Sequence, residues 1–251
     1  MTQFEQFIKE RAYLLNVSPA TVRWHTHALK WLPCETPTPS QLKETVLRMR
    51  EKGLKATGAN AAIRSINAYL KWRELPGRIT PLQEPEFIPP MFTKEQVARL
   101  IAWRPTTFYD RRLHTLALIL LDNGCRITEA LSIRMIELDL DGLLITLTGK
   151  GRKQRIVPIS IELRRVLFRW VRDTEKQPHD LLLSSKGGSP LGRNVCLRDV
   201  KRLCLRLGFT PPARTLHAFR HTFAVAYLRR GGSVFHLQKI LGHRSLEMSR
   251  R

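Results

Sequence analysis

Residues 136–160 read IELDLDGLLITLTGKGRKQRIVPIS, and in this stretch the sequence favours β-structure. Its apolar and β-branched residues gather in three runs, at 136–140, 143–148 and 155–159. The dipeptide Asp141-Gly142 is a strong tight-turn signal between the first two runs, and the GKGR segment forms a second turn. The stretch therefore predicts a three-stranded antiparallel sheet with Lys150 at a turn.

Helical patterns surround this stretch. Residues 113–124, LHTLALILLDNG, predict a largely buried helix because most of them are apolar. Further helices are predicted at 161–172, 194–207, 215–230 and 234–241. The first 75 residues predict four short helices, with Ser18 and Thr38 as N-caps, and Thr93 caps a helix that follows them. The fold class is therefore mainly α with a small antiparallel β-sheet.

A proline-rich stretch divides the chain. Residues 76–92, PGRITPLQEPEFIPPMF, contain five prolines, which exclude a helix and favour an extended segment. We therefore expect a helical domain at 1–75, a linker at 76–92 and a second domain at 93–251.

The charge points to a polyanionic partner. Lysine and arginine number 43 against 21 aspartates and glutamates, a net charge of +22, and the excess lies in both expected domains. Double-stranded DNA is the favoured partner, because every neutralised phosphate releases a counterion. A basic protein without such a role and a binder of membrane surfaces are the alternatives.

The remaining bulk features indicate a cytoplasmic protein. No apolar run approaches the roughly 20 residues of a transmembrane helix, and the N-terminus does not resemble a signal peptide. The four cysteines lack the C-x-x-C spacing of a zinc site and fit a reducing compartment. In a bacterial cell, a DNA-binding protein of this kind would associate with the nucleoid.

Five basic residues of the second domain have unusual settings. Arg126 follows a glycine at a helix start, Lys150 lies at a turn, His217 and Arg220 share one helical face, and His243 follows Gly242 at a helix end. Taken singly, each fits an ordinary surface or packing role.

A metal pair is one alternative for His217 and His221, which are four residues apart. The glutamate of the H-E-x-x-H motif is absent and no third ligand is evident, so we expect no metal and no cofactor.

The order of these motifs carries more information than any one of them. G-x-R-x-x-E at 124–129, GKG at 149–151, H-x-x-R-H-T at 217–222 and LGH at 241–243 together resemble the phage-integrase or tyrosine-recombinase family, most closely its Xer-type bacterial members. The resemblance covers nearly the whole chain. It implies a two-domain architecture, in which a helical core-binding domain precedes an α+β catalytic domain.

The resemblance also implies a chemistry and a role for each residue. Family members cut and rejoin DNA through a 3′-phosphotyrosine intermediate, without a cofactor. Arg126 and Arg220 would hold the scissile phosphate, and Lys150 would protonate the leaving 5′ oxygen. His217 would accept the tyrosine proton, and His243 would hydrogen-bond the phosphate. Lys153 is a rival of Lys150 for the general acid.

Other residues receive supporting roles. Glu129 would orient Arg126 or His217, although a solvated surface position is the alternative, and His221 would be structural. Five basic residues of the 194–207 helix region are candidates for DNA contacts, against a solvated basic face: Arg193, Arg198, Lys201, Arg202 and Arg206.

The family nucleophile lies about nine residues beyond the second histidine, one position past Arg251. None of the four tyrosines, Tyr13, Tyr69, Tyr109 and Tyr227, matches it. We therefore expect a recombinase shortened at its C-terminus and unable to cleave. A non-cleaving relative that regulates an active recombinase, a tyrosine supplied in trans and a type IB topoisomerase are the alternatives. Homotetramers on paired DNA sites are expected for the full-length form, and a monomer in solution for this chain.

Overall fold

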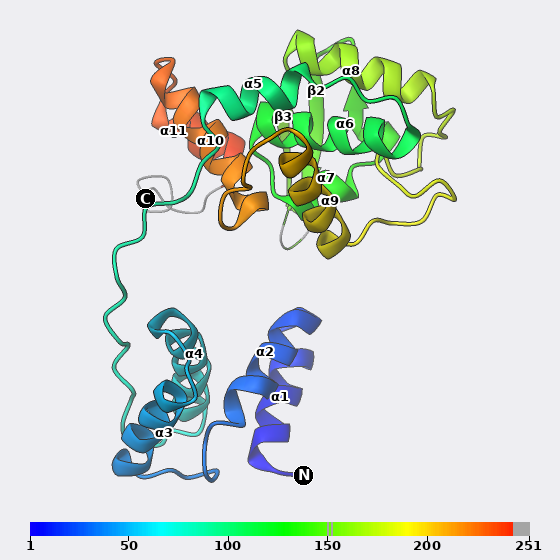
Figure 1. Cartoon of the computed structure of the whole chain (residues 1–251). Helices are drawn as coiled ribbons and strands as arrows, with labels where there is room; N and C mark the ends of the chain where they lie inside the picture. The colour runs from blue at the N-terminus through cyan, green and yellow to red at the C-terminus, as the bar shows by residue number, and fades with distance from the viewer. Residues whose placement is uncertain (150, 152, 243–251) are drawn as a thin grey trace. The chain divides into compact units, whose positions relative to one another are not determined.

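The computed structural model describes residues 1–149, 151 and 153–242 (Figure 1). The fold is mainly helical with one small antiparallel sheet, which confirms the predicted fold class. The chain divides into two compact units, unit 1 at Met1–Phe87 and unit 2 at Ile88–Arg251. Among the described residues, no helix has the length and apolar character that crossing a membrane requires.

Unit 1 consists of four helices: α1 Gln3–Tyr13, α2 Pro19–Leu29, α3 Pro39–Glu51 and α4 Ala56–Trp72. The starts of α2 and α3 are capped as predicted. The side-chain oxygens of Ser18 and Thr38 accept backbone N–H groups of the first turns of α2 and α3. The apolar faces of the helices bury a core that includes Phe7, Met49 and Tyr69.

The first part of the predicted linker packs against unit 1. Two asparagines of α4 bind it in the manner of a neighbouring strand. Asn67 exchanges two hydrogen bonds with the backbone of Ile79, both 2.9 Å long, and Asn60 exchanges two with the backbone of Leu82, both 2.8 Å long. Ile79 is buried in the core of unit 1. These side-chain amides satisfy a backbone that proline keeps out of a helix.

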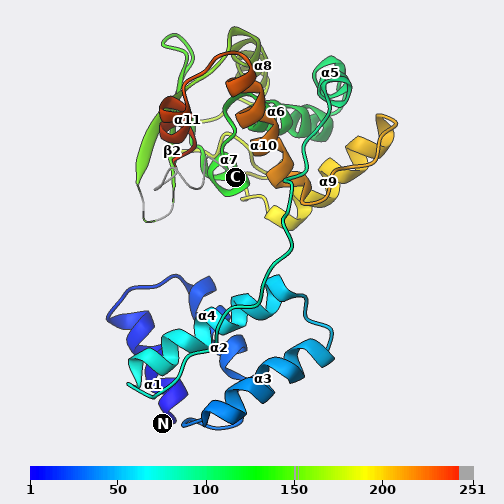
Figure 2. The same cartoon turned by 90° about the vertical axis from the view of Figure 1, so that its left-hand side faces the viewer.

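Unit 2 contains the remaining helices and the sheet. The helices are α5 Lys94–Ala102, α6 Phe108–Asn123, α7 Ile127–Ser132, α8 Ile161–Arg172, α9 Arg193–Arg206, α10 Thr215–Arg229 and α11 Val234–Leu241. The capping box of Thr93 and Gln96 begins α5 as predicted. Helix α6 contributes Leu116, Ile119 and Leu120 to the core, which confirms its predicted burial. Figure 2 shows the sheet and α11 on one side of α10 and α9 on the other.

The sheet has the order β1-β2-β3, with both pairs antiparallel. Its strands are β1 Leu138–Asp139, β2 Leu144–Thr148 and β3 Gln154–Pro158. The first strand is shorter than predicted because Met135–Glu137 form a 3-10 turn, η1. Ile145 and Leu147 point into the core and pair with Val157 and Arg155. Since paired residues share one face, Arg155 lies on the core-facing side of the sheet.

Candidate active site

Gly124 determines where Arg126 lies. It ends α6 in the left-handed region, with φ +59°, and a Cβ atom there would lie 2.4 Å from Cδ1 of Phe223. Only glycine fits both the backbone conformation and the space. The chain therefore turns sharply, and Arg126 becomes the N-cap residue of α7 with its side chain 40% exposed.

Helix α10 brings His217 and Arg220 to the same place. Its first residue follows Arg214, which has a left-handed backbone with φ +53°. Arg220 is buried and donates from Nη1 to the carbonyl of Gly124 at 3.0 Å and from Nη2 to the carbonyl of Leu241 at 2.6 Å. His217 is exposed one turn earlier. Arg220 therefore fixes α10 against the turn that carries Arg126.

Glu129 joins Arg126 to a residue that the sequence did not single out. Its Oε1 accepts from Nη1 of Arg126 at 2.9 Å, and its Oε2 accepts from the backbone N–H of Arg126 at 2.8 Å. Arg155 grips the same carboxylate with two hydrogen bonds, from Nη1 at 3.0 Å and from Nη2 at 2.8 Å. Arg155 lies on the same face of the predicted strand as Val157 and Ile159, which are buried. A charged residue on an otherwise apolar strand face needs a buried partner, and this pattern could have identified Arg155 from the sequence.

The charges of this group do not balance. Arg126, Arg155 and Arg220 face the single carboxylate of Glu129. Burial alone would raise the pKa of Glu129, but hydrogen bonds from Arg155 and Arg126 hold it at about 2. Desolvation and then the repulsion of Arg126 lower the pKa of Arg220 to about 10. The site therefore carries positive charge in excess, as an anion-binding site requires.

Both histidines of α10 have a lowered pKa, which favours their neutral form. Loss of hydration lowers the pKa of His217 below 6.5, and the neighbouring charges of Arg193 and Arg214, then of Arg220 and Arg126, lower it further. Desolvation followed by the proximity of His217 lowers the pKa of His221. Neutral His217 can accept a proton. Within the described part of the chain, no three His, Cys, Asp or Glu side chains gather as a metal site would need.

Two of the predicted site residues, Lys150 and His243, lie outside the described residues. Lys150 belongs to the connection between β2 and β3, and His243 follows Gly242, the C-cap residue of α11. Lys153, the rival general acid, is exposed just before β3.

The five arginines and lysines proposed to contact DNA differ in their partners. All are exposed on or at the start of α9. Arg193 lies close enough to His217 to lower its pKa. Arg198 pairs with the neighbouring Asp199 at 3.2 Å. Arg206 is held by Asp110 at 2.8 Å and by the ring of Trp103, so it is the least available of the five.

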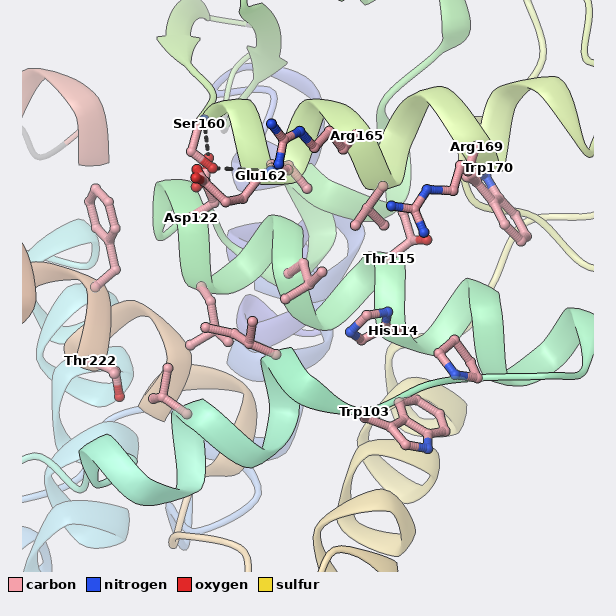
Figure 3. Close-up of a pocket in the computed structure, with 18 of the residues that line it drawn as sticks. Trp103, His114, Thr115, Asp122, Ser160, Glu162, Arg165, Arg169, Trp170 and Thr222 are labelled. Carbon is pink, nitrogen blue, oxygen red and sulfur yellow. Dashed lines mark hydrogen bonds between the residues drawn. The ribbon is translucent and has the colours of Figure 1, made fainter.

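A cavity of about 970 Å³ lies apart from this cluster, among α5, α6, α8 and α10 (Figure 3). Its wall includes His114, Arg165 and Arg169, and the backbone N–H of Ser160 donates to Asp122 at its edge. None of the predicted catalytic residues of the described chain lines it.

Comparisons with known proteins identify the family. The model of the phage integrase family matches residues 90–251. Tyrosine recombinase XerC of Xanthomonas axonopodis pv. citri is 25% identical over 212 residues, which cover 81% of this chain and 69% of the relative. Tyrosine recombinase XerA of Thermococcus kodakarensis is 28% identical over 238 residues, 91% of this chain and 82% of the relative. The chain thus spans about two thirds of the XerC relative's length.

Solved structures show the same fold. The Tn1549 transposon integrase in complex with transposon right end DNA is 22% identical with a TM-score of 0.78, and the match covers 99% of this chain and 93% of that one. A lambda integrase dimer bound to a core site also gives a TM-score of 0.78, at 14% identity, with coverage of 99% and 93%. With the family model matching well over half of its residues, the chain belongs to the phage integrase family, the tyrosine recombinases.

Proposed function

We propose that the arginine cluster of unit 2 binds one phosphodiester of double-stranded DNA and prepares it for attack by a tyrosine, as in site-specific recombination. The observation that carries the proposal is the convergence of Arg126 and Arg220 at the turn after α6, with His217 one turn before Arg220 and a positive charge that Glu129 does not cancel. The DNA complexes of the structurally similar integrases support the same partner.

The two arginines have donors left for a ligand. Arg126 gives one side-chain hydrogen bond to Glu129, and Arg220 gives two to backbone carbonyls. A guanidinium has five N–H groups, so both retain donors for the non-bridging oxygens of a phosphate. These oxygens gain negative charge in the pentacoordinate transition state. Loss of one such donor should cost roughly 3–4 kcal/mol of barrier.

The other proposed residues would transfer protons, bind the phosphate or hold an arginine in place. His217, whose pKa is lowered by desolvation and by the neighbouring arginines, would take the proton of the attacking tyrosine. Lys150 would protonate the leaving 5′ oxygen, and His243 would bind the phosphate. Both roles are proposed from the family resemblance of the sequence motifs. Glu129 would keep Arg126 in place.

The tyrosines of the described chain do not belong to this cluster. Tyr109 lies in the first turn of α6, and Gly124 at the other end of the helix is about 22 Å away, since a helix rises about 1.5 Å per residue. Tyr227 lines the separate cavity and stacks near Phe223. Tyr13 and Tyr69 are in unit 1. A second candidate function is that of a relative that binds DNA without cutting it and regulates an active recombinase.

One experiment separates the two candidates. A duplex selected by the protein from a random pool is nicked, so that a cleaved strand diffuses away and the covalent product accumulates. The 251-residue chain and the same chain extended by a segment starting with tyrosine at 252 are then compared on denaturing gels. An adduct from the extended chain alone supports the proposal, and no adduct from either contradicts it.

The mode of DNA engagement is also proposed. Both units are basic, so each would contact the duplex, with Arg193, Arg198, Lys201 and Arg202 of α9 nearest to the phosphates. A tetramer on two paired sites would form on DNA and a monomer would exist without it. Light scattering with and without the selected duplex measures this, and a stable tetramer without DNA would contradict it.

A further inference from the structure

Arg155 forms more hydrogen bonds than the neutralisation of Glu129 would require. Its side chain is 15% exposed and points from β3 toward the core. Nη1 and Nη2 both reach Glu129, and Nε donates to the carbonyl of Ile240 at 2.7 Å. A lysine could neutralise the carboxylate, but only the planar fork of an arginine can make these three bonds together.

Glu129 connects Arg155 to Arg126 through hydrogen bonds, so the position of Arg155 affects that of Arg126. Each of its two oxygens accepts one hydrogen bond from Arg155 and one from Arg126. One bond from Arg126 comes from its backbone and the other from its guanidinium, so Glu129 restrains both. Because Glu129 is only 2% exposed, water does not compete for these bonds.

Arg155 also holds the end of α11. The last carbonyls of a helix have no partner inside it and carry partial negative charge. Arg155 takes the carbonyl of Ile240, and Arg220 takes that of Leu241. A Cβ atom on Gly242 would lie 3.3 Å from Nη1 of Arg155, so the chain passes closely over this guanidinium.

We infer that Arg155 is a positioning residue, which sets Arg126 through Glu129 and ties it to the end of α11. The inference rests on the proposed function, because it assigns Arg126 to the phosphate. Strand β3, helix α7 and the end of α11 meet at this one guanidinium. A shift of Arg155 therefore moves the phosphate-binding arginine without removing any group that touches DNA.

Arg155→Lys tests this, with Arg164→Lys as the matched control. Arg164 also donates to a backbone carbonyl, of Leu140 at 2.7 Å, and to a carboxylate, of Asp141 at 3.4 Å, beside the same sheet but away from the cluster. In the tyrosine-extended chain, Arg155→Lys should slow adduct formation by about 10²-fold, the scale of a 1 Å misplacement, with DNA affinity nearly unchanged. Arg164→Lys should leave both unchanged.

A double variant separates positioning from general loosening. In a protein that already carries Arg126→Lys, the further change Arg155→Lys should slow the reaction by less than about threefold, because the residue acts through Arg126. If Arg155→Lys slowed adduct formation about 10²-fold in the Arg126→Lys background as well, the inference would be overturned. It would also be overturned if Arg155→Lys alone formed the adduct as fast as Arg164→Lys.

Hydrogen exchange gives a readout that needs no catalysis. In Arg155→Lys, peptides over 124–130 and over 238–242 should lose protection together, and in Arg164→Lys neither should. Unchanged protection of both peptides in Arg155→Lys would overturn the inference. No adduct from the unsubstituted extended chain would overturn the proposed function instead, while the exchange result still decides the role of Arg155.

Discussion

Replacing Glu129 with glutamine should destabilise unit 2 by an amount that depends on pH. The folded protein holds the pKa of Glu129 at about 2, against an ordinary value of 4.5. A depression of this size corresponds to about 3 kcal/mol of stability at pH 7, at about 1.4 kcal/mol per pKa unit. Glutamine keeps the shape, but it loses the charge and turns an N–H₂ group toward the donors of Arg155.

The direction of the pH effect follows from the depressed pKa. The stabilisation is complete above about pH 4.5 and is lost as the pH falls toward 2. The unfolding free energies of the wild type and Glu129→Gln should therefore differ by about 3 kcal/mol at pH 7 and converge near pH 2. For a unit of this size, the difference at pH 7 lowers the Tm by roughly 6–12 °C.

Calorimetry of the full chain at several pH values measures this difference. Glu162→Gln is the control, because Glu162 is exposed in the first turn of α8 and its loss should cost less than about 1 kcal/mol. A difference between wild type and Glu129→Gln that stays the same from pH 7 to pH 2 would refute the reasoning. An unchanged Tm at pH 7 would refute it as well.

Three further outcomes are expected. Gly124→Ala should destabilise unit 2 by more than about 2 kcal/mol in thermal unfolding, because its Cβ atom would overlap Phe223 at φ +59°. Sulfate should raise the Tm of unit 2 more than chloride at equal ionic strength, and Arg220→Gln should remove the increment, since the excess positive charge favours a divalent anion. The adduct rate of the tyrosine-extended chain should fall as the pH drops through a value below 6.5, and His217→Gln should abolish this limb.

Local patterns predicted the helices and the sheet well, since their causes are local. The caps of Ser18, Thr38 and Thr93 depend on residues two or three positions away, and all three are confirmed. The first strand was predicted too long because its start is set from a distance. The backbone N–H groups of Met135 and Ile136 donate to carbonyls of Asp180 and Pro178, which no local pattern reveals.

In the candidate site too, the sequence predicts local relations between residues but not distant ones. His217 and Arg220 are three residues apart, so the sequence alone places them on one helix face. Arg155 lies 26 residues from Glu129, and only the sheet register brings them together. The linker shows the same limit, because the bonds of Asn60 and Asn67 to it span 22 and 12 residues, respectively. The predicted roles of Lys150 and His243 remain predictions.

The most direct test replaces one non-bridging oxygen of the scissile phosphate by a methyl group. In the proposed site, Arg126 and Arg220 bind the negative charge of these oxygens, and a methylphosphonate carries no such charge in the ground state. On the ordinary phosphate, Arg220→Gln should slow adduct formation by the tyrosine-extended chain by about 10²–10³-fold. On the neutral substrate the same substitution should cost less than about tenfold. An equal loss on both substrates would contradict the claim that this cluster binds the phosphate charge.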